Sequence, residues 1–228
     1  ALIKQFVEDI CSDQSKLTTN TIRVPSNQRN RLLSLFAFDM LDCGNRGEYT
    51  CPAKIRNGID DKYYKQTGTT ANQITDIVLN SEKERLLKSD SAYGKVEFIH
   101  SLIRDYFAAY SISHLSKDEL LKRIKEEFLE YTKWDETLSI LVGIVDEKTS
   151  EAIIKHLAGI DPYFAAQCFP IAKHVDSKTE DRLINTLSVN LETHNLIPVL
   201  DKTIDAFVNL KSEKAFFPLI RLVEKGDE

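Results

Sequence analysis

The segment FIHSLIRDYFAAY, residues 98 to 110, places one histidine at the start of an apolar helix. Apolar side chains follow the i, i+3, i+4, i+7 spacing of an amphipathic helix: Ile99, Leu102, Ile103, Tyr106 and Tyr110. We expect these side chains to face a core. His100 has two interpretations, a core histidine that bonds a backbone group or a residue that contacts something outside this chain.

The residues before this segment predict a small β-hairpin within a helical module. Two strand-like pieces, near 86–88 and 95–98, flank a turn of Ser, Asp and Gly. Upstream, a helix is predicted from about Ser26 to Leu41, a short extended piece at 48–51, and a helix opened by a capping box of Thr70 and Gln73. Helices beside a two-stranded wing predict a winged-helix domain for residues 20 to 115. Residues 1 to 19 are expected to end a preceding helical domain.

From residue 116 onward the sequence predicts only helices. Capping boxes are expected at Ser116 with Glu119 and at Ser177 with Glu180. Helices are predicted near 117–131, 134–145, 149–158, 162–174, 177–190, 193–209 and 213–224. Successive short helices are typical of an α-solenoid, so residues 116 to 228 are predicted to form HEAT-like repeats. The expected fold class is therefore mainly α.

Composition narrows the class of protein. The chain has 228 residues, 42% of them hydrophobic and 29% charged, with a net charge of −5, which gives no general attraction to nucleic acid or anionic lipid. No apolar run reaches the roughly 18 residues needed to span a bilayer. The chain starts at Ala1 and has no secretory signal pattern, so we expect a cytoplasmic piece of a longer protein. Its four cysteines lack CxxC spacing, and free thiols are favoured over two disulfides.

Motifs that carry catalysis are missing from the sequence. It contains no GxxxxGK[ST] phosphate loop, GxGxxG, HExxH or GxSxG, so no catalytic or metal-binding residue is assigned and the chain itself is not expected to be an enzyme. Residues 20–66 hold eight Lys or Arg against five Asp or Glu. Three of these cations, Arg23, Arg29 and Arg31, cluster around a helix start, which leaves DNA binding as a minor alternative.

The segment 98–110 resembles the F-x-H-x-x-x-x-E-Y-F-A-A signature in the winged-helix region of NACHT-type STAND NTPases. Residues 84–98 are similar to the hairpin that precedes this signature, and residues 28–41 to the first winged-helix segment. Trp134, Glu136 and Gly143 match the W-x-E-x-x-x-x-x-x-G helix that follows. The chain departs from the family at Arg104-Asp105, where Gln-Glu is usual.

This resemblance implies a regulatory and sensor fragment of a signal-transduction ATPase of the innate-immune or anti-phage type. It implies that His100 contacts the phosphates of ADP bound to an upstream nucleotide-binding domain and so holds the inactive state. Arg104, Asp105 and Trp134 would be interdomain contacts. ADP or ATP with Mg would belong to the longer protein and no cofactor to this chain. The solenoid would bind a protein ligand, and activation would bring homo-oligomerisation.

Two other classes of function remain open. The chain could be a helical-repeat scaffold for protein–protein interaction without a nucleotide role, or a DNA-binding regulator. A phosphate loop upstream of Ala1 would favour the ATPase interpretation, and its absence the scaffold. Strongly salt-dependent DNA binding would favour the regulator.

Overall fold

A computed structural model describes residues 5, 26–42, 48–50, 61–90, 95–128, 132–193 and 196–226. The chain divides into two compact units. The first comprises Ala1–Ser116 with Tyr131–Leu138, and the second Lys117–Glu130 with Ser139–Glu228. Residues 1 to 19, expected to end a preceding helical domain, lie outside the described residues, apart from Gln5, which is helical.

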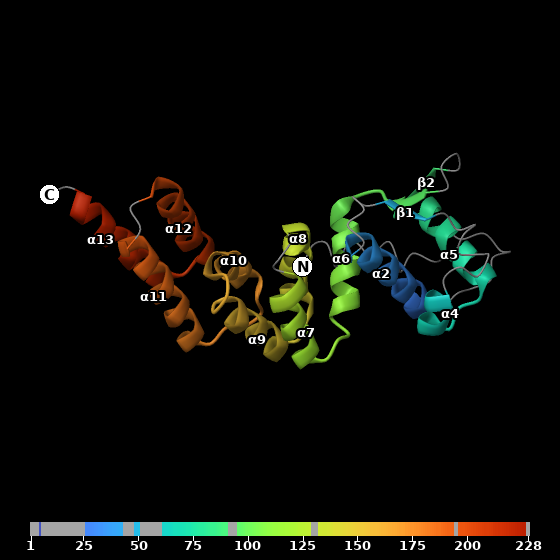
Figure 1. Cartoon of the computed structure of the whole chain (residues 1–228), viewed down its shortest axis with the longest axis horizontal. Helices are drawn as coiled ribbons and strands as arrows, with labels where there is room; N and C mark the ends of the chain where they lie inside the picture. Colours follow the sequence, from blue (N-terminus) through green and yellow to red (C-terminus); the bar gives the residue numbers. More distant parts are fainter. Residues whose placement is uncertain are drawn as a thin grey trace. The chain divides into compact units, whose positions relative to one another are not determined.

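The first unit alternates helices with the strands of one small sheet (Figure 1). Its elements are α2 (Ser26–Asp42), β1 (Glu48–Thr50), α4 (Asp61–Thr67), α5 (Ala71–Lys83), β2 (Leu87–Asp90), β3 (Lys95–Phe98), α6 (Ser101–Ile112) and the 3-10 turn η3 (Thr132–Trp134). The predicted hairpin is therefore confirmed as β2 and β3, and the extended piece at 48–51 as β1.

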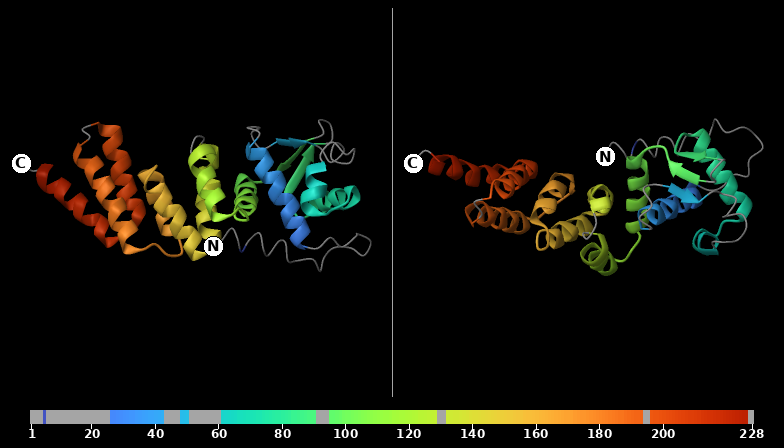
Figure 2. Two further views of the ribbon diagram at one scale, coloured as in Figure 1. Left: turned by 60° about the horizontal axis from the view of Figure 1, so that its bottom comes forward. Right: turned by 45° about the horizontal axis from the view of Figure 1, so that its top comes forward.

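The sheet is antiparallel with strand order β1-β3-β2, so the second strand of the hairpin lies in its centre (Figure 2). Its register pairs Tyr49 with Val96 and Leu87 with Phe98. The side chains of Leu87, Val96 and Phe98 are buried, whereas Lys88 is exposed and pairs with Glu97. This alternation sets one face of the sheet against the core.

Helices α2 and α6 pack against each other and form the core of the first unit. Ala108 and Ala109 have no exposed surface, and such small side chains allow two helices to approach closely. Phe36 and Phe107 are each 1% exposed. Truncating either to alanine should cost about 3–5 kcal/mol.

The second unit is a row of short helices, as predicted. It contains α7 (Lys117–Arg123), the π turn η2 (Ile124–Phe128), most of α8 (Asp135–Ile144), α9 (Glu147–Leu157), α10 (Pro162–Cys168), η4 (Phe169–Ile171), α11 (Ser177–Thr193), α12 (Ile197–Leu210), η5 (Glu213–Ala215) and α13 (Phe216–Gly226). Neighbouring helices pack in succession, α9 with α10, α10 and α11 with α12, and α12 with α13 (Figure 2).

A glycine allows close packing between α8 and η4. A Cβ built on Gly143 in α8 would lie 3.1 Å from Cγ2 of Ile171 in η4. Cys168 is a buried thiol that forms no disulfide, as expected, while the other three cysteines lie outside the described residues.

Candidate functional site

His100 lies at the junction between the sheet and helix α6, where it is the N-cap residue. The Ile99 N–H donates to the Leu86 carbonyl at 3.0 Å, which ties the junction to the hairpin. The backbone of His100 itself is extended, and the His100 carbonyl accepts hydrogen bonds from Ile103 N and Arg104 N at 3.1 and 3.3 Å. The imidazole is exposed. His100 is therefore not a core histidine, although its ring does bond a backbone group, the Leu102 N–H.

The cap fixes which imidazole nitrogen carries the proton. Nδ1 of His100 accepts from the Leu102 N–H at 3.1 Å, so a neutral ring carries its hydrogen on Nε2. A doubly protonated ring would set its Nδ1–H against the Leu102 N–H and lose this bond. The ring therefore caps α6 in its neutral form and retains one donor, Nε2–H, for another group.

The Arg104-Asp105 pair sits one turn into α6. Arg104 donates from Nε and Nη2 to Asp105 Oδ1 at 3.1 and 3.0 Å, and Thr137 Oγ1 donates to the same oxygen at 3.4 Å. Burial raises the pKa of Asp105, and this effect outweighs Arg104, Thr137 and His100, which lower it. The side chain of Asp105 is 5% exposed and that of Arg104 is 19% exposed. The structure thus places Asp105 inside the first unit and leaves Arg104 partly at its surface.

Trp134 is packed into the first unit. Its ring lies 5.4 Å from that of Phe38, centroid to centroid, and only 2% of the residue is exposed. The preceding residue, Lys133, donates to the Asp42 carbonyl at 3.2 Å. These contacts attach residues 132–138 to the end of α2. His100 lies at the start of another helix, α6.

One of the three cations expected to cluster around the start of α2, Arg29, is buried in an ion pair. Arg29 Nη1 donates to both carboxylate oxygens of Glu84 at 2.8 and 3.0 Å, and the two side chains are 6% and 13% exposed. Arg31 is exposed, and Arg23 lies outside the described residues. The Arg29 charge is therefore committed to an ion pair inside the unit rather than to a phosphate contact. This pair, 55 residues apart in sequence, was not predicted.

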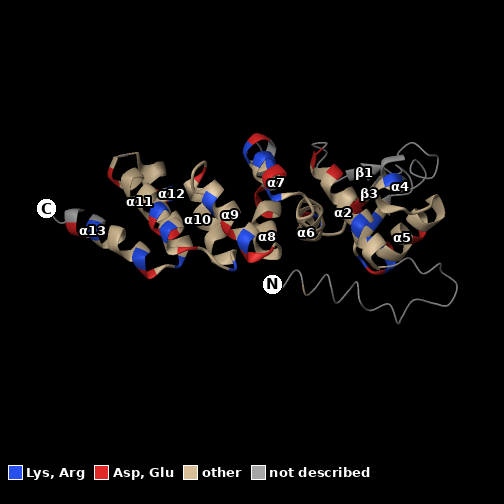
Figure 3. Cartoon of the chain, turned by 90° about the horizontal axis from the view of Figure 1, so that it is seen from below, with Lys and Arg blue, Asp and Glu red and all other residues tan. Residues whose placement is uncertain are grey.

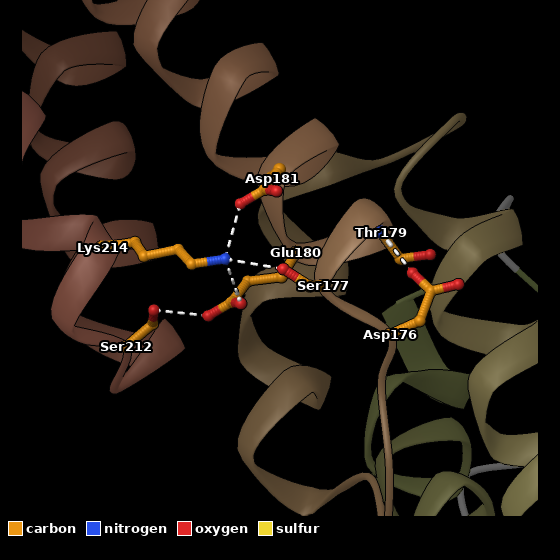
Figure 4. Close-up of polar contacts among 7 residues, drawn as sticks. All are labelled: Asp176, Ser177, Thr179, Glu180, Asp181, Ser212 and Lys214. Carbon is orange, nitrogen blue, oxygen red and sulfur yellow. Dashed lines mark hydrogen bonds and ion pairs between the residues drawn. The ribbon is translucent and has the colours of Figure 1, made fainter.

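A second polar cluster holds η5, the turn before α13, to α11 (Figure 4). Lys214 Nζ lies 2.7 Å from Asp181 Oδ1, 3.1 Å from Glu180 Oε2 and 2.9 Å from Ser177 Oγ. Ser212 Oγ donates to Glu180 Oε1 at 2.5 Å. The hydrogen bonds to Asp181 and then Glu180 raise the pKa of Lys214. The sequence gave no signal for this cluster beyond opposite charges far apart in the chain.

The N-cap residue of α11 differs from the predicted one. Asp176, not Ser177, caps α11, because its Oδ1 accepts from Thr179 N at 2.5 Å (Figure 4). This bond lowers the pKa of Asp176. Glu180, predicted to reach back to the cap, instead accepts from Ser212 and pairs with Lys214.

The surface of the second unit carries charges of both signs (Figure 3). A shallow hollow of about 490 Å³ runs along one side of α11. It is lined by Lys178, Asp181, Arg182, Asn185, Thr186 and Val189. Such a surface offers polar and apolar contacts along a helix and no enclosed cavity for a small molecule.

Comparison with known proteins gives no family assignment, since no family model and no curated protein matches the chain. In the part that the structure describes, no group of three His, Cys, Asp or Glu side chains is arranged to hold a metal ion. Among the same residues no helix is long and apolar enough to cross a membrane.

Proposed function

We propose that the first unit is a winged-helix module and the second a HEAT-like helical repeat, arranged in the chain as in NACHT-type STAND NTPases. The order α2-β1-α4-α5-β2-β3 with sheet order β1-β3-β2 supports the first assignment. It is the pattern of a helix, a strand, two helices and a two-stranded wing whose last strand pairs with the first. The successive packing of α9 to α13 supports the second.

The function proposed is regulation within a larger nucleotide-binding signalling protein. His100 contacts the phosphates of ADP held by an upstream domain and keeps the protein inactive. Exchange of the nucleotide removes the contact and frees the winged-helix module to move, as a two-state element biased by a ligand. The observation that carries this proposal is the geometry of His100, an exposed imidazole whose Nδ1 is engaged by its own helix.

The chemistry of the proposed contact follows from that geometry. With Nδ1 bonded to Leu102 N–H, the ring is held at the start of α6 and Nε2–H is its only donor. A hydrogen bond to a charged phosphate oxygen is stronger than one between neutral groups. The helix start adds a favourable field for an anion. A neutral histidine therefore suffices, and the cationic ring is not needed.

The remaining parts of the proposed mechanism lie outside this chain. The phosphate loop, Mg and hydrolysis would belong to the nucleotide-binding domain. The helical repeat would bind a protein ligand, and its hollow along α11 offers one surface for it. Ligand binding there would shift the protein toward the open, oligomerising state.

The buried Arg29 weakens the DNA-binding alternative, because one of the three cations on which it relied is paired with Glu84. The alternative function, a scaffold for protein–protein interaction, is compatible with the same structure of both units. It differs only in assigning no ligand to His100.

The test must separate the cap from the phosphate contact, because His100→Ala removes both. Loss of the cap alone should cost about 1 kcal/mol of stability. Asparagine is among the best N-cap residues, so His100→Asn keeps the cap and removes the Nε2–H donor. We therefore compare the ADP that copurifies with the intact protein in wild type, His100→Asn and His100→Ala.

The proposal predicts that both variants lose ADP and oligomerise spontaneously, and that only His100→Ala melts at a lower temperature. Equal ADP in wild type and His100→Asn would reduce His100 to a helix cap. No nucleotide in any of the three proteins would favour the scaffold.

A further inference from the structure

One side of α11 carries four exposed side chains at the spacing of a helical stripe: Lys178, Arg182, Asn185 and Val189. At 100° per residue they fall within about 60° of one another, opposite the buried side chains of the same helix. The hollow of about 490 Å³ runs along this stripe, and the residues that line it belong to α11. The stripe is therefore one continuous surface.

The free charge of this hollow is positive. Lys178 and Arg182 are exposed, and neither side chain has an ion-pair partner among the described residues. The carboxylate in the hollow, Asp181, has its Oδ1 2.7 Å from Lys214 Nζ, so its charge is offset within the chain. Two cations one helical turn apart are left to attract an anionic group, in a chain whose net charge is −5.

The other end of the stripe is uncharged. Asn185 is exposed, and Val189 is 56% exposed. Asparagine and valine are poor helix formers, and Glu, Lys or Ala would serve an exposed helix position better. A solvated helix face gains nothing from these two residues. A binding surface gains from both, because the amide can donate and accept hydrogen bonds and the valine offers an apolar contact.

The stripe lies within the row of helices and not on its last helix, α13. Helix α11 packs on α10 and on α12. The Lys214 side chain holds the turn before α13 to Glu180 and Asp181 of α11. The stripe is therefore presented by a helix that its neighbours fix in place.

We propose that this surface binds an extended acidic segment of a partner protein. Along the helix axis Lys178 and Arg182 are about 6 Å apart, at 1.5 Å per residue. Side chains at alternate positions of an extended peptide are about 6.7 Å apart, so two carboxylates with this spacing pair with both cations. The Asn185 amide then bonds the peptide backbone, and an apolar side chain beyond the acidic pair contacts Val189.

A nucleic acid fits these observations less well than an acidic peptide. Nucleic-acid binding relies on several cations for successive phosphates, and the net charge of −5 opposes a polyanion. The apolar contact at Val189 also has no use for a phosphate backbone. The inference rests on the proposed ligand-binding role of the helical repeat and not on the contact of His100 with ADP.

Fluorescence anisotropy of the 228-residue chain with labelled peptides tests the proposal. The first probe is the fluorescein-labelled, amidated peptide GESESLG, whose two carboxylates occupy alternate positions. The second probe, GEESSLG, has the same charge but adjacent carboxylates, which point to opposite sides of an extended chain. At low ionic strength the first probe should bind at least about threefold more tightly, because only its carboxylates pair with both cations.

Charge removal on α11 provides the second readout. Lys178→Gln and Arg182→Gln should each weaken binding of the first probe about two- to fivefold, and the double variant about tenfold. Lys148→Gln is the matched control, since Lys148 is exposed on α9 of the same unit and does not line the hollow. All three positions are exposed, and circular dichroism confirms that each variant is folded.

Three results would overturn the proposal: no binding of the first probe, equal binding of the two probes, or equal weakening by Lys148→Gln. Tighter binding of an oligothymidylate that is lost in the double variant would also overturn it and would assign the surface to nucleic acid. None of these results bears on His100, because the ADP content of the intact protein tests that contact separately.

Discussion

The ion pair between Arg29 and Glu84 gives the sharpest prediction about stability. Glu84→Gln leaves the Arg29 guanidinium, whose side chain is 6% exposed, without its charged partner. Breaking a buried pair from one side costs about 3–5 kcal/mol, and we expect the lower end because the Glu84 side chain is 13% exposed. Replacing both residues by methionine should return stability to within about 1 kcal/mol of wild type.

The two single variants should differ in their response to pH. Burial raises the pKa of Glu84, and Arg29 opposes this effect. In Arg29→Met the opposing charge is gone, so the carboxyl pKa rises further and the group can become neutral by binding a proton. A raised carboxyl pKa means that the folded state gains stability as pH falls through that pKa. The deficit of Arg29→Met should therefore shrink below neutral pH, whereas that of Glu84→Gln should not.

Urea denaturation followed by tryptophan fluorescence measures the unfolding free energy of each variant at each pH. Trp134 is the single tryptophan and is buried in the first unit, so its emission reports the unfolding of that unit. Additive losses in the double variant, or an Arg29→Met deficit that does not change with pH, would refute the reasoning.

Three further predictions concern other sites. Arg85 follows α5 with a φ of 59°, a left-handed conformation that glycine adopts without strain, so Arg85→Gly should raise the unfolding free energy by about 1 kcal/mol in the same urea assay. Lys214→Met should speed amide hydrogen exchange in α13, because Lys214 holds the turn before α13 to Asp181 and Glu180 of α11. Lys178→Met on α11 is the control, and unchanged exchange in α13 of the Lys214 variant would contradict this role. Asp176→Ala should lower the melting temperature at neutral pH, because the Asp176 carboxylate caps α11. The difference from wild type should vanish as pH falls through the lowered pKa of Asp176, and a difference independent of pH would contradict this role of the carboxylate.

Local patterns were sufficient to predict most elements. The spacing of apolar residues predicted most helices of both units, although not α4 (Asp61–Thr67), and the Thr70–Gln73 capping box is present with bonds of 3.4 and 2.8 Å. The hairpin followed from two strand-like pieces around a turn. These features depend on residues a few positions apart.

Contacts between distant residues could not be predicted in this way. No local pattern pairs Arg29 with Glu84 or Lys214 with Glu180. The exposure of His100 was also undecided, because FIHS fits either a core histidine or one that contacts a group outside the chain, and its role as the cap of α6 was not predicted. Only the exposed position of the His100 side chain in the structure distinguishes them.

The central claim is that His100 contributes a hydrogen-bond donor to ADP as well as a cap to α6. The most direct measurement is the ADP content of the intact protein purified with His100→Asn, at a melting temperature equal to that of wild type. The account predicts that the nucleotide is lost while the fold is as stable as before. Full retention of ADP by this variant would contradict it.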